Sequence, residues 1–306
     1  MSNEKNYTNE EFQREFQKIL NYYKSLYSTQ ENPKAFLLGG QPGAGKSGLE
    51  KMINVKGDFI SISGDDYRKF HPLYEQLNKI YGKDASIYTQ QWAGEMVENL
   101  VKVAREEKWN VILEGTLRRA ELPIKEAEDF KKNGYSVELY VVAVKPEKSR
   151  LGTLTRYEEM LQQGTTPRMT PKEHHDLVVN NITNNLEIIY NSKAFDNISL
   201  FDRGNNLLYS YKENSDISPK VILEKEFSRE WKIEEIKEKI EAKWTAFKET
   251  FLSLNNKKEA VLKFINAEGT VAGIFYLLTQ SKILIKMILP KKIKGWLRFG
   301  TGDVYT

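Results

Sequence analysis

Apolar residues recur every three to four positions between residues 9 and 28, beginning with Phe12. That period predicts an amphipathic helix with one face packed on a folded core. Pro33 follows shortly afterwards, and because proline does not fit a helix interior, we expect the helix to end before it. Residues 1–32 are therefore predicted to form an N-terminal helix packed on the flank of the core.

Five short apolar runs follow, and helical patterns separate them. They cover residues 36–38, 58–63, 110–114, 137–144 and 198–201. Continuous apolar runs of this length are typical of strands buried on both faces of a parallel sheet. Their alternation with helices predicts a three-layer α/β sandwich with a mostly parallel, five-stranded core sheet. In such sheets ligands bind beyond the carboxyl ends of the strands, so the residues after each run are the candidates for chemistry.

The alternating pattern ends near residue 215, where residues 214–219 are rich in turn formers. We predict an α/β domain over 33–215 and a mainly helical, basic extension of unknown role over 216–306. From residue 257 onward the chain holds nine Lys or Arg and three acidic residues. Its apolar runs are too short to span a bilayer. A packed helix or a partly disordered tail is favoured there, and an amphipathic segment at a membrane surface or on a partner is the alternative.

Composition narrows the class of protein. The chain has 306 residues, of which 40% are hydrophobic and 29% are charged, as in soluble globular proteins. A net charge of +4 is too small to indicate a nucleic-acid partner. The absence of cysteine excludes disulfides and thiolate metal sites. The polar N-terminus has no apolar signal core, so we expect a cytoplasmic protein.

The first apolar run leads into the octapeptide Gly40-Gln41-Pro42-Gly43-Ala44-Gly45-Lys46-Ser47. It fits the phosphate-binding pattern G-x-x-x-x-G-K-[ST] and follows a predicted strand, as that pattern requires. Glycines let successive backbone N–H groups point into one hollow, and the next helix adds the positive end of its dipole. We predict that all eight residues bind ATP, with Lys46 at the β- and γ-phosphates and the Ser47 hydroxyl on Mg²⁺.

Carboxylates follow the second and third runs. Asp65 and Asp66 come after the second run, where a carboxylate can accept a proton from a substrate hydroxyl. Position alone does not separate the two, and either one can instead cap the next helix. Glu114 ends the third run, and Thr116 and Arg118 follow it. Glu114 is a candidate for an indirect contact with Mg²⁺, and the other two for hydrogen bonds to a polar or anionic substrate. A polar exposed loop is the alternative.

Two arginines follow the fourth run. Arg156 lies in a helical stretch, 151–163, and Arg168 lies in the loop that follows. A guanidinium there can stabilise the charge that develops during phosphoryl transfer, although a lone arginine on a helix is usually a solvated surface charge. The sequence His174-His175-Asp176 suggests metal binding, but the one other histidine of the chain is His71. We therefore expect a helix-surface role for that tripeptide.

In this order and spacing, the motifs resemble the zeta toxin family of P-loop kinases. The resemblance covers about residues 33–215 and rests on the segments FLLGGQPGAGKS, GDDYRKFHP, VILEGTLR, LGTLTRYEEM, RMTPKEHHD and SLFDRG. It implies a P-loop kinase-like fold that uses ATP and Mg²⁺ to phosphorylate the 3′-hydroxyl of the sugar in UDP-N-acetylglucosamine. In that family the activity is toxic because it drains a cell-wall precursor, and a small helical, epsilon-like antitoxin blocks the nucleotide site.

Residue roles carry over by position. The resemblance implies that Lys46 is the essential phosphate lysine and that Asp65, rather than Asp66, accepts the proton. Arg156 and Arg168 match the two arginines directed at the phosphate. Four further residues match positions that contact or orient the nucleotide-sugar: Glu98, Glu114, Thr116 and Arg118.

The sequence departs from the family at Glu126, which stands where a related sequence has a threonine near the substrate. Two other functions remain open. One is another P-loop small-molecule kinase, similar to chloramphenicol phosphotransferase. The other is a non-catalytic nucleotide-binding module whose C-terminal segment docks on a membrane or a partner. Asp65 and both arginines argue against such a module, because binding alone does not require all three.

Overall fold

The computed structural model describes residues 5–163, 169–232 and 235 of the chain. Contacts divide the chain into a compact unit, Met1–Arg229, and a second unit, Glu230–Thr306. The first unit contains the α/β domain. Most of the predicted C-terminal extension lies outside the described residues.

A six-stranded sheet forms the centre of the first unit, in the order β2-β3-β1-β4-β5-β6. Its strands are β1 Lys34–Gly39, β2 Phe59–Ile62, β3 Asn110–Glu114, β4 Ser136–Val142, β5 Asn197–Phe201 and β6 Leu207–Ser210. The first five are parallel, which confirms the predicted core sheet. The sixth, β6, pairs antiparallel with β5 at the edge. The sequence did not indicate β6, because its first two leucines remain exposed and no buried run marks it.

Helices precede, separate and follow these strands. Their bounds are α1 Asn9–Leu26, α2 Lys46–Ile53, α3 Gly64–Tyr67, α4 Tyr74–Tyr81, α5 Ala85–Tyr88, α6 Gln90–Glu106, α7 Glu121–Lys132, α8 Pro146–Gln162, α9 Lys172–Ser192 and α10 Pro219–Ser228. Two short 3-10 helices, η1 Arg68–Phe70 and η2 Gly82–Asp84, adjoin α3 and α4.

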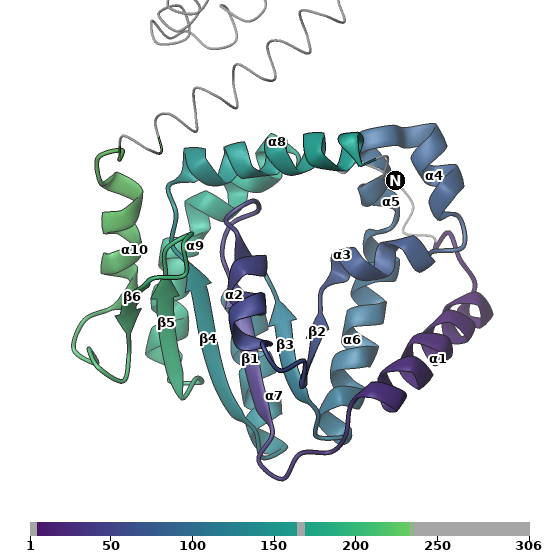
Figure 1. Ribbon diagram of the computed structural model, residues 1–306, viewed down its shortest axis with the longest axis horizontal. Helices are drawn as coiled ribbons and strands as arrows, with labels where there is room; N and C mark the ends of the chain where they lie inside the picture. The colour runs from purple at the N-terminus through teal and green to yellow at the C-terminus, as the bar shows by residue number, and fades with distance from the viewer. Residues whose placement is uncertain (1–4, 164–168, 233–234, 236–306) are drawn as a thin grey trace, which may run out of the picture. The chain divides into compact units, whose positions relative to one another are not determined.

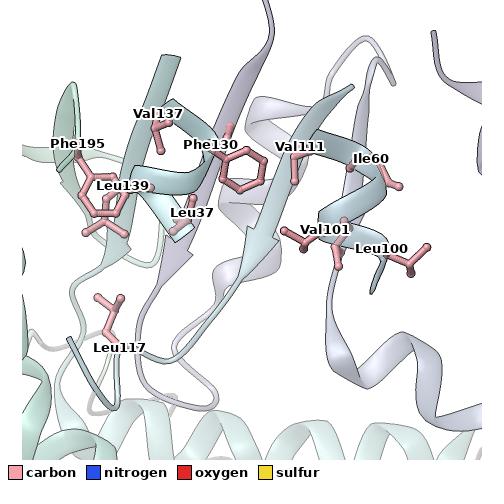
Figure 2. Packing of buried hydrophobic residues seen from close by; sticks show 14 of the residues in the cluster. Leu37, Ile60, Leu100, Val101, Val111, Leu117, Phe130, Val137, Leu139 and Phe195 are labelled. Atoms are coloured by element: carbon pink, nitrogen blue, oxygen red, sulfur yellow. The ribbon is translucent and has the colours of Figure 1, made fainter. Parts of the chain in front are cut away.

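The sheet is covered on both faces. Successive residues of a strand point to opposite faces, so Leu37 and Leu38 of β1 enter different clusters. Leu37 packs with buried side chains of α1, α6, α7 and α9, whereas Leu38 packs with Leu49 of α2. Figure 2 shows the larger cluster around Leu37, including Phe130 of α7. The result is the predicted three-layer sandwich. Helix α8 lies across the carboxyl ends of the strands (Figure 1), the edge where ligands bind in such folds.

The N-terminal helix α1 begins with a capping box. The backbone N–H of Thr8 donates to the Glu11 carboxylate at 2.8 Å, and the N–H of Glu11 donates to the Thr8 hydroxyl at 3.1 Å. Such reciprocal bonds satisfy amide groups that a helix start leaves unpaired. The Phe12 ring then packs edge-on against Trp92 of α6, with centroids 5.2 Å apart. Helix α1 therefore supports α6.

Helix α10 packs against β5 and α9 and buries Leu223 completely. The buried ammonium of Lys145 donates to the carbonyl oxygens of Phe227 at 2.8 Å and Arg229 at 2.5 Å. These bonds satisfy carbonyl groups at the end of α10, which have no partner within the helix. Within the described ranges, no helix combines the length and hydropathy that crossing a bilayer demands.

The central strand β4 gives a direct test of this packing. Leu139 is fully buried there, whereas Leu122 on α7 is 52% exposed. We expect Leu139→Ala to lower the free energy of unfolding by about 2–5 kcal/mol, because it leaves a cavity in the core. Leu122→Ala should change it by less than about 0.5 kcal/mol. Urea denaturation of both variants checks this, and equal losses would contradict the assigned burial.

Candidate active site

The octapeptide forms a loop between β1 and α2 whose backbone follows conformations that only glycine adopts readily. Gly43 has φ +76° and Gly45 has φ +104°. With no Cβ, these residues allow the chain to turn back and start α2 at Lys46. The backbone N–H groups of such a loop, together with the N-terminus of the next helix, are a favourable site for phosphate.

Helix α8 packs directly on this loop. A Cβ atom added to Gly43 would lie 2.2 Å from the carbonyl oxygen of Ser149 and 2.6 Å from the backbone nitrogen of Thr153. A Cβ atom added to Gly152 would lie 2.4 Å from the Gly43 carbonyl oxygen. The two backbones therefore touch at glycines on both sides, which fixes the position of α8 relative to the loop.

Lys46 is only 7% exposed, and loop carbonyls hold its ammonium group. The group donates to the oxygen of Gly40 at 3.1 Å and to that of Gln41 at 3.4 Å. It also lies 3.4 Å from Oε1 of Glu114, at the end of β3. The predicted phosphate lysine and one predicted substrate carboxylate thus form an ion pair.

Other side chains of the loop differ in direction. Gln41 and Ala44 are fully buried, and Gln41 Nε2 donates to the Val144 carbonyl at 2.8 Å. These two therefore offer a ligand their backbone rather than their side chains. Ser47 is exposed at the first turn of α2. An exposed hydroxyl there suits Mg²⁺, which prefers oxygen ligands and takes few from protein when phosphates supply others.

Asp65 follows β2 and lies in α3. Its Oδ1 accepts a hydrogen bond from Arg68 Nε at 3.0 Å, and its Oδ2 accepts one from Arg156 Nη2 at 3.1 Å. Arg156 comes from α8, 91 residues further along the chain. The structure therefore brings together two predicted catalytic residues, Asp65 and Arg156, and adds a second cationic group, Arg68.

Helix α8 links this carboxylate to the phosphate loop. Gly152 touches Gly43, and Arg156 lies four residues later, about 6 Å along the helix axis. One turn of α8 thus separates the contact with the loop from the contact with Asp65. The candidate base and the phosphate site converge on the same segment of α8.

The loop after β3 contains a residue in an unusual conformation. Leu117 has φ +54°, a left-handed backbone that costs a side-chain-bearing residue about 1–2 kcal/mol. Its carbonyl accepts a hydrogen bond from Asn185 at 2.9 Å. Its side chain packs so closely on Gly39 that a Cβ atom there would lie 2.5 Å away. Figure 2 shows Leu117 beside the strand ends. The neighbouring Thr116 and Arg118, both half-buried, are thereby held next to the start of the phosphate loop.

Glu98 and Glu126 lie in different places. Glu98 is exposed on α6, and its neighbour Val97 lies 3.8 Å from where a Cβ of Gly64 would be, beside Asp65. Glu126 instead pairs with Arg105 at 2.7 Å. Arg105 lies eight residues beyond Val97, about 12 Å further along α6. Burial raises the pKa of Glu126, although Arg105 opposes the shift. Glu126 therefore belongs to helix packing.

The expected surface role of the histidine pair is wrong for His175. This residue is 2% exposed, and its Nε2 lies 2.8 Å from the Ser149 hydroxyl on α8. Burial lowers its pKa, despite the Asp176 carboxylate at 3.4 Å. The hydrogen bond joins α9 to the segment of α8 that touches Gly43. His174 is half-buried, and burial together with the Arg118 guanidinium lowers its pKa.

Arg168 lies outside the described residues. Arg150 of α8 donates to the Thr170 carbonyl at 2.8 Å, just beyond that gap.

Arg203, in the turn after β5, was not singled out from the sequence. A Cβ added to Gly45 would lie 3.3 Å from its Cγ, and one added to Gly152 would lie 3.2 Å from its guanidinium nitrogens. An arginine in a turn carries no sequence signal for such a position, because the fold creates the proximity.

A glycine-rich loop lies between a central parallel strand and a helix, and an arginine of α8 pairs with the carboxylate that follows β2. These features define a P-loop kinase-like protein. A model of the family described as Zeta toxin matches residues 18–216. Toxin PezT of Streptococcus pneumoniae serotype 4 is 39% identical over 228 residues, which cover 74% of this chain and 90% of the relative. Toxin zeta of Streptococcus pyogenes is 36% identical over 244 residues, which cover 79% and 85%. The chain belongs to the zeta toxin family.

Two solved structures are similar to this chain in fold. A chain from the PezAT chromosomal toxin–antitoxin system of Streptococcus pneumoniae matches with a TM-score of 0.71 and 34% identity, covering 79% of this chain and 98% of that one. A complex of AvrRxo1-ORF1 with AvrRxo1-ORF2 matches with a TM-score of 0.54 and 14% identity, covering 76% and 80%. The second likeness is one of fold alone.

Alanine should have opposite effects on stability at Gly43, which touches α8, and at Gly94, which does not. Gly43→Ala should destabilise the protein by about 2 kcal/mol or more, because it adds left-handed strain and a clash with α8. It should also weaken ATP binding. Gly94→Ala, at a helical position where the new Cβ has no atom of the described residues within 4 Å, should stabilise the protein by about 0.5–1 kcal/mol. Thermal unfolding and ATP titration check both, and a neutral Gly43→Ala would contradict the contact.

Proposed function

We propose that this protein is an ATP-dependent kinase that phosphorylates the 3′-hydroxyl of the sugar of UDP-N-acetylglucosamine. The observation that carries the proposal is Arg156, which pairs with Asp65 at 3.1 Å from a position one turn beyond the contact between α8 and the phosphate loop. Phosphoryl transfer to an alcohol needs a proton acceptor and a cationic group close to the phosphate site, and one helix here contacts both the loop and Asp65. Membership of the zeta toxin family supports the choice of substrate.

Each residue then has a role. The loop and Lys46 bind the β- and γ-phosphates of ATP, and the ammonium of Lys46 leaves the carbonyls that hold it here. Asp65 accepts the proton of the sugar hydroxyl while the hydroxyl oxygen bonds to the γ-phosphorus. The bond from that phosphorus to the β–γ bridging oxygen breaks, and ADP leaves with the electron pair. Arg156, with Arg168, neutralises the charge that spreads over the transferred group.

The remaining predicted residues position the acceptor and the metal. Thr116 and Arg118, held by Leu117, are suited to the polar and anionic parts of a nucleotide-sugar, and Glu98 and Glu114 to hydroxyl groups. Ser47 would hold Mg²⁺. When bound, the metal supplies positive charge against the phosphate oxygens. The reaction consumes ATP, so we propose that it takes place in the cytoplasm.

The reaction is tested by incubating the protein with ATP, Mg²⁺ and UDP-N-acetylglucosamine and recording mass spectra. We expect a gain of one phosphate on the nucleotide-sugar and its location at the sugar 3′-oxygen by NMR. The same assay with chloramphenicol and other small alcohols separates this function from that of another P-loop kinase. ATP binding without any phosphorylated product would instead favour a non-catalytic module.

Two neighbouring carboxylates provide a matched pair of variants. Asp65→Asn should lower kcat by about 10²- to 10⁴-fold, because it removes the proton acceptor while keeping the shape of the side chain. Asp66→Asn, which changes the charge equally one residue away, should stay close to wild type. Steady-state kinetics measure both, and the role of Asp65 is lost if the two variants behave alike.

The toxin names of the relatives support a further part of the proposal. Draining UDP-N-acetylglucosamine would stop cell-wall synthesis, so we expect induction of this chain in a bacterial host to arrest growth. The Asp65→Asn chain should not do so, at equal protein level. We propose a small helical antitoxin as the partner that prevents this in the source cell, since the PezAT match names a toxin–antitoxin system. Arrest by both chains would show that toxicity is independent of catalysis.

A further inference from the structure

Arg68 binds Asp65 but has no part in the proposed mechanism. Its side chain is 16% exposed, whereas that of Arg156 is 54% exposed. Besides Asp65, the guanidinium donates through Nη1 to the Ser86 carbonyl at 2.6 Å and to the Thr89 hydroxyl at 2.9 Å. Thr89 is itself 1% exposed. Arg68 is therefore anchored to α5 and to the start of α6 at the same time as it holds Asp65.

The backbone around Arg68 is also fixed. Tyr67 is 1% exposed, its carbonyl accepts a hydrogen bond from Trp92 Nε1 at 3.1 Å, and its hydroxyl lies 3.1 Å from that of Tyr23. Asp65 and Arg68 are three residues apart on α3 and η1, so their side chains lie on the same side of the helix. The pair thus rests on a segment that buried hydrogen bonds tie to α1 and α6.

The two arginines bind different oxygens of the carboxylate. Arg68 holds Oδ1 from the buried side, and Arg156 binds Oδ2 from the exposed side of α8. A guanidinium with three anchors keeps its place when a ligand arrives. An exposed guanidinium with a long side chain can exchange a carboxylate for a phosphate oxygen.

We propose that Arg68 is a positioning residue that holds Asp65 through Oδ1, so that Oδ2 is the oxygen that accepts the proton of the substrate hydroxyl. Arg156 leaves Oδ2 for the γ-phosphate when ATP binds. The proton then passes from the hydroxyl to Oδ2 as the oxygen–phosphorus bond forms and ADP leaves, and it is later released to water. This proposal rests on the kinase reaction proposed above.

The kinetic test compares Arg68→Gln, Arg68→Lys and the control Lys69→Gln. Lys69→Gln removes the same charge from the next residue, whose ammonium lies over the Phe70 ring. For Arg68→Gln we expect kcat to fall about tenfold to a hundredfold, because the base loses its orientation. KM for ATP should not change. Arg68→Lys keeps the charge but not the planar fork, so it should recover part of kcat. Lys69→Gln should match wild type.

The pH profile separates positioning from a general loss of structure. Without the Arg68 guanidinium the Asp65 carboxylate loses a cationic neighbour, which raises its pKa. The acid limb of the Arg68→Gln rate profile should therefore move to higher pH. A variant that is merely less folded would lose activity without moving the limb. An unmoved limb in Arg68→Gln overturns the proposal, whatever the loss of kcat.

A second measurement needs no acceptor substrate. NMR titration of protein with ¹³C-labelled aspartate carboxyls gives the protonation midpoint of Asp65, assigned by the signal that Asp65→Asn removes. The midpoint should be higher in Arg68→Gln than in wild type and in Lys69→Gln. If wild type phosphorylates no nucleotide-sugar, the proposed function fails and this titration still decides on Arg68. Equal midpoints in all three proteins would refute the role of Arg68.

Discussion

The contact between Gly43 and helix α8 is the constraint on which the site depends. The loop can turn at φ +76° because glycine has no Cβ, and no side chain fits there because the Ser149 carbonyl already occupies the space. Since Arg156 lies one turn beyond, the same contact sets the position of its guanidinium. A phosphate loop alone fixes where an anion binds. The addition of α8 also fixes where a second cation and the carboxylate it holds can lie.

Four charged groups of this site are paired with one another. Lys46 pairs with Glu114, and Arg156 pairs with Asp65. The ion pair with Glu114 offsets part of the free energy that the nearly buried ammonium of Lys46 loses on leaving water. Because the cations already have partners, a polyphosphate that binds must displace the carboxylates. Its binding free energy is therefore the difference between the contacts it forms with the cations and the ion pairs it breaks. Under the proposed function, that exchange lets Oδ2 of Asp65 accept a proton while Arg68 still holds Oδ1.

The sequence predicted what depends on local pattern and missed what depends on tertiary contact. The run 110–114 coincides with β3, and the glycine spacing located the phosphate loop, because both signals are written in consecutive residues. Strand β6 was missed because an edge strand with exposed leucines has no buried run. The burial of His175 was missed because it depends on Ser149 of another helix. The resemblance selected Asp65 over Asp66, and the structure supplies the arginines that hold it.

The position of Asp65 depends partly on a helix that the sequence placed only on the flank of the core. Tyr23 of α1 meets the hydroxyl of Tyr67, 44 residues later, and Phe12 packs on Trp92, which holds the Tyr67 carbonyl. Tyr67 lies between Asp65 and Arg68 in the chain, so a shift of its backbone would displace both of these residues. Ordering a short helix of four residues is unfavourable in isolation. Buried aromatic contacts from α1 and α6 supply the stabilisation that a helix as short as α3 lacks. For this reason α1, a helix far from the phosphate loop, belongs to the functional unit.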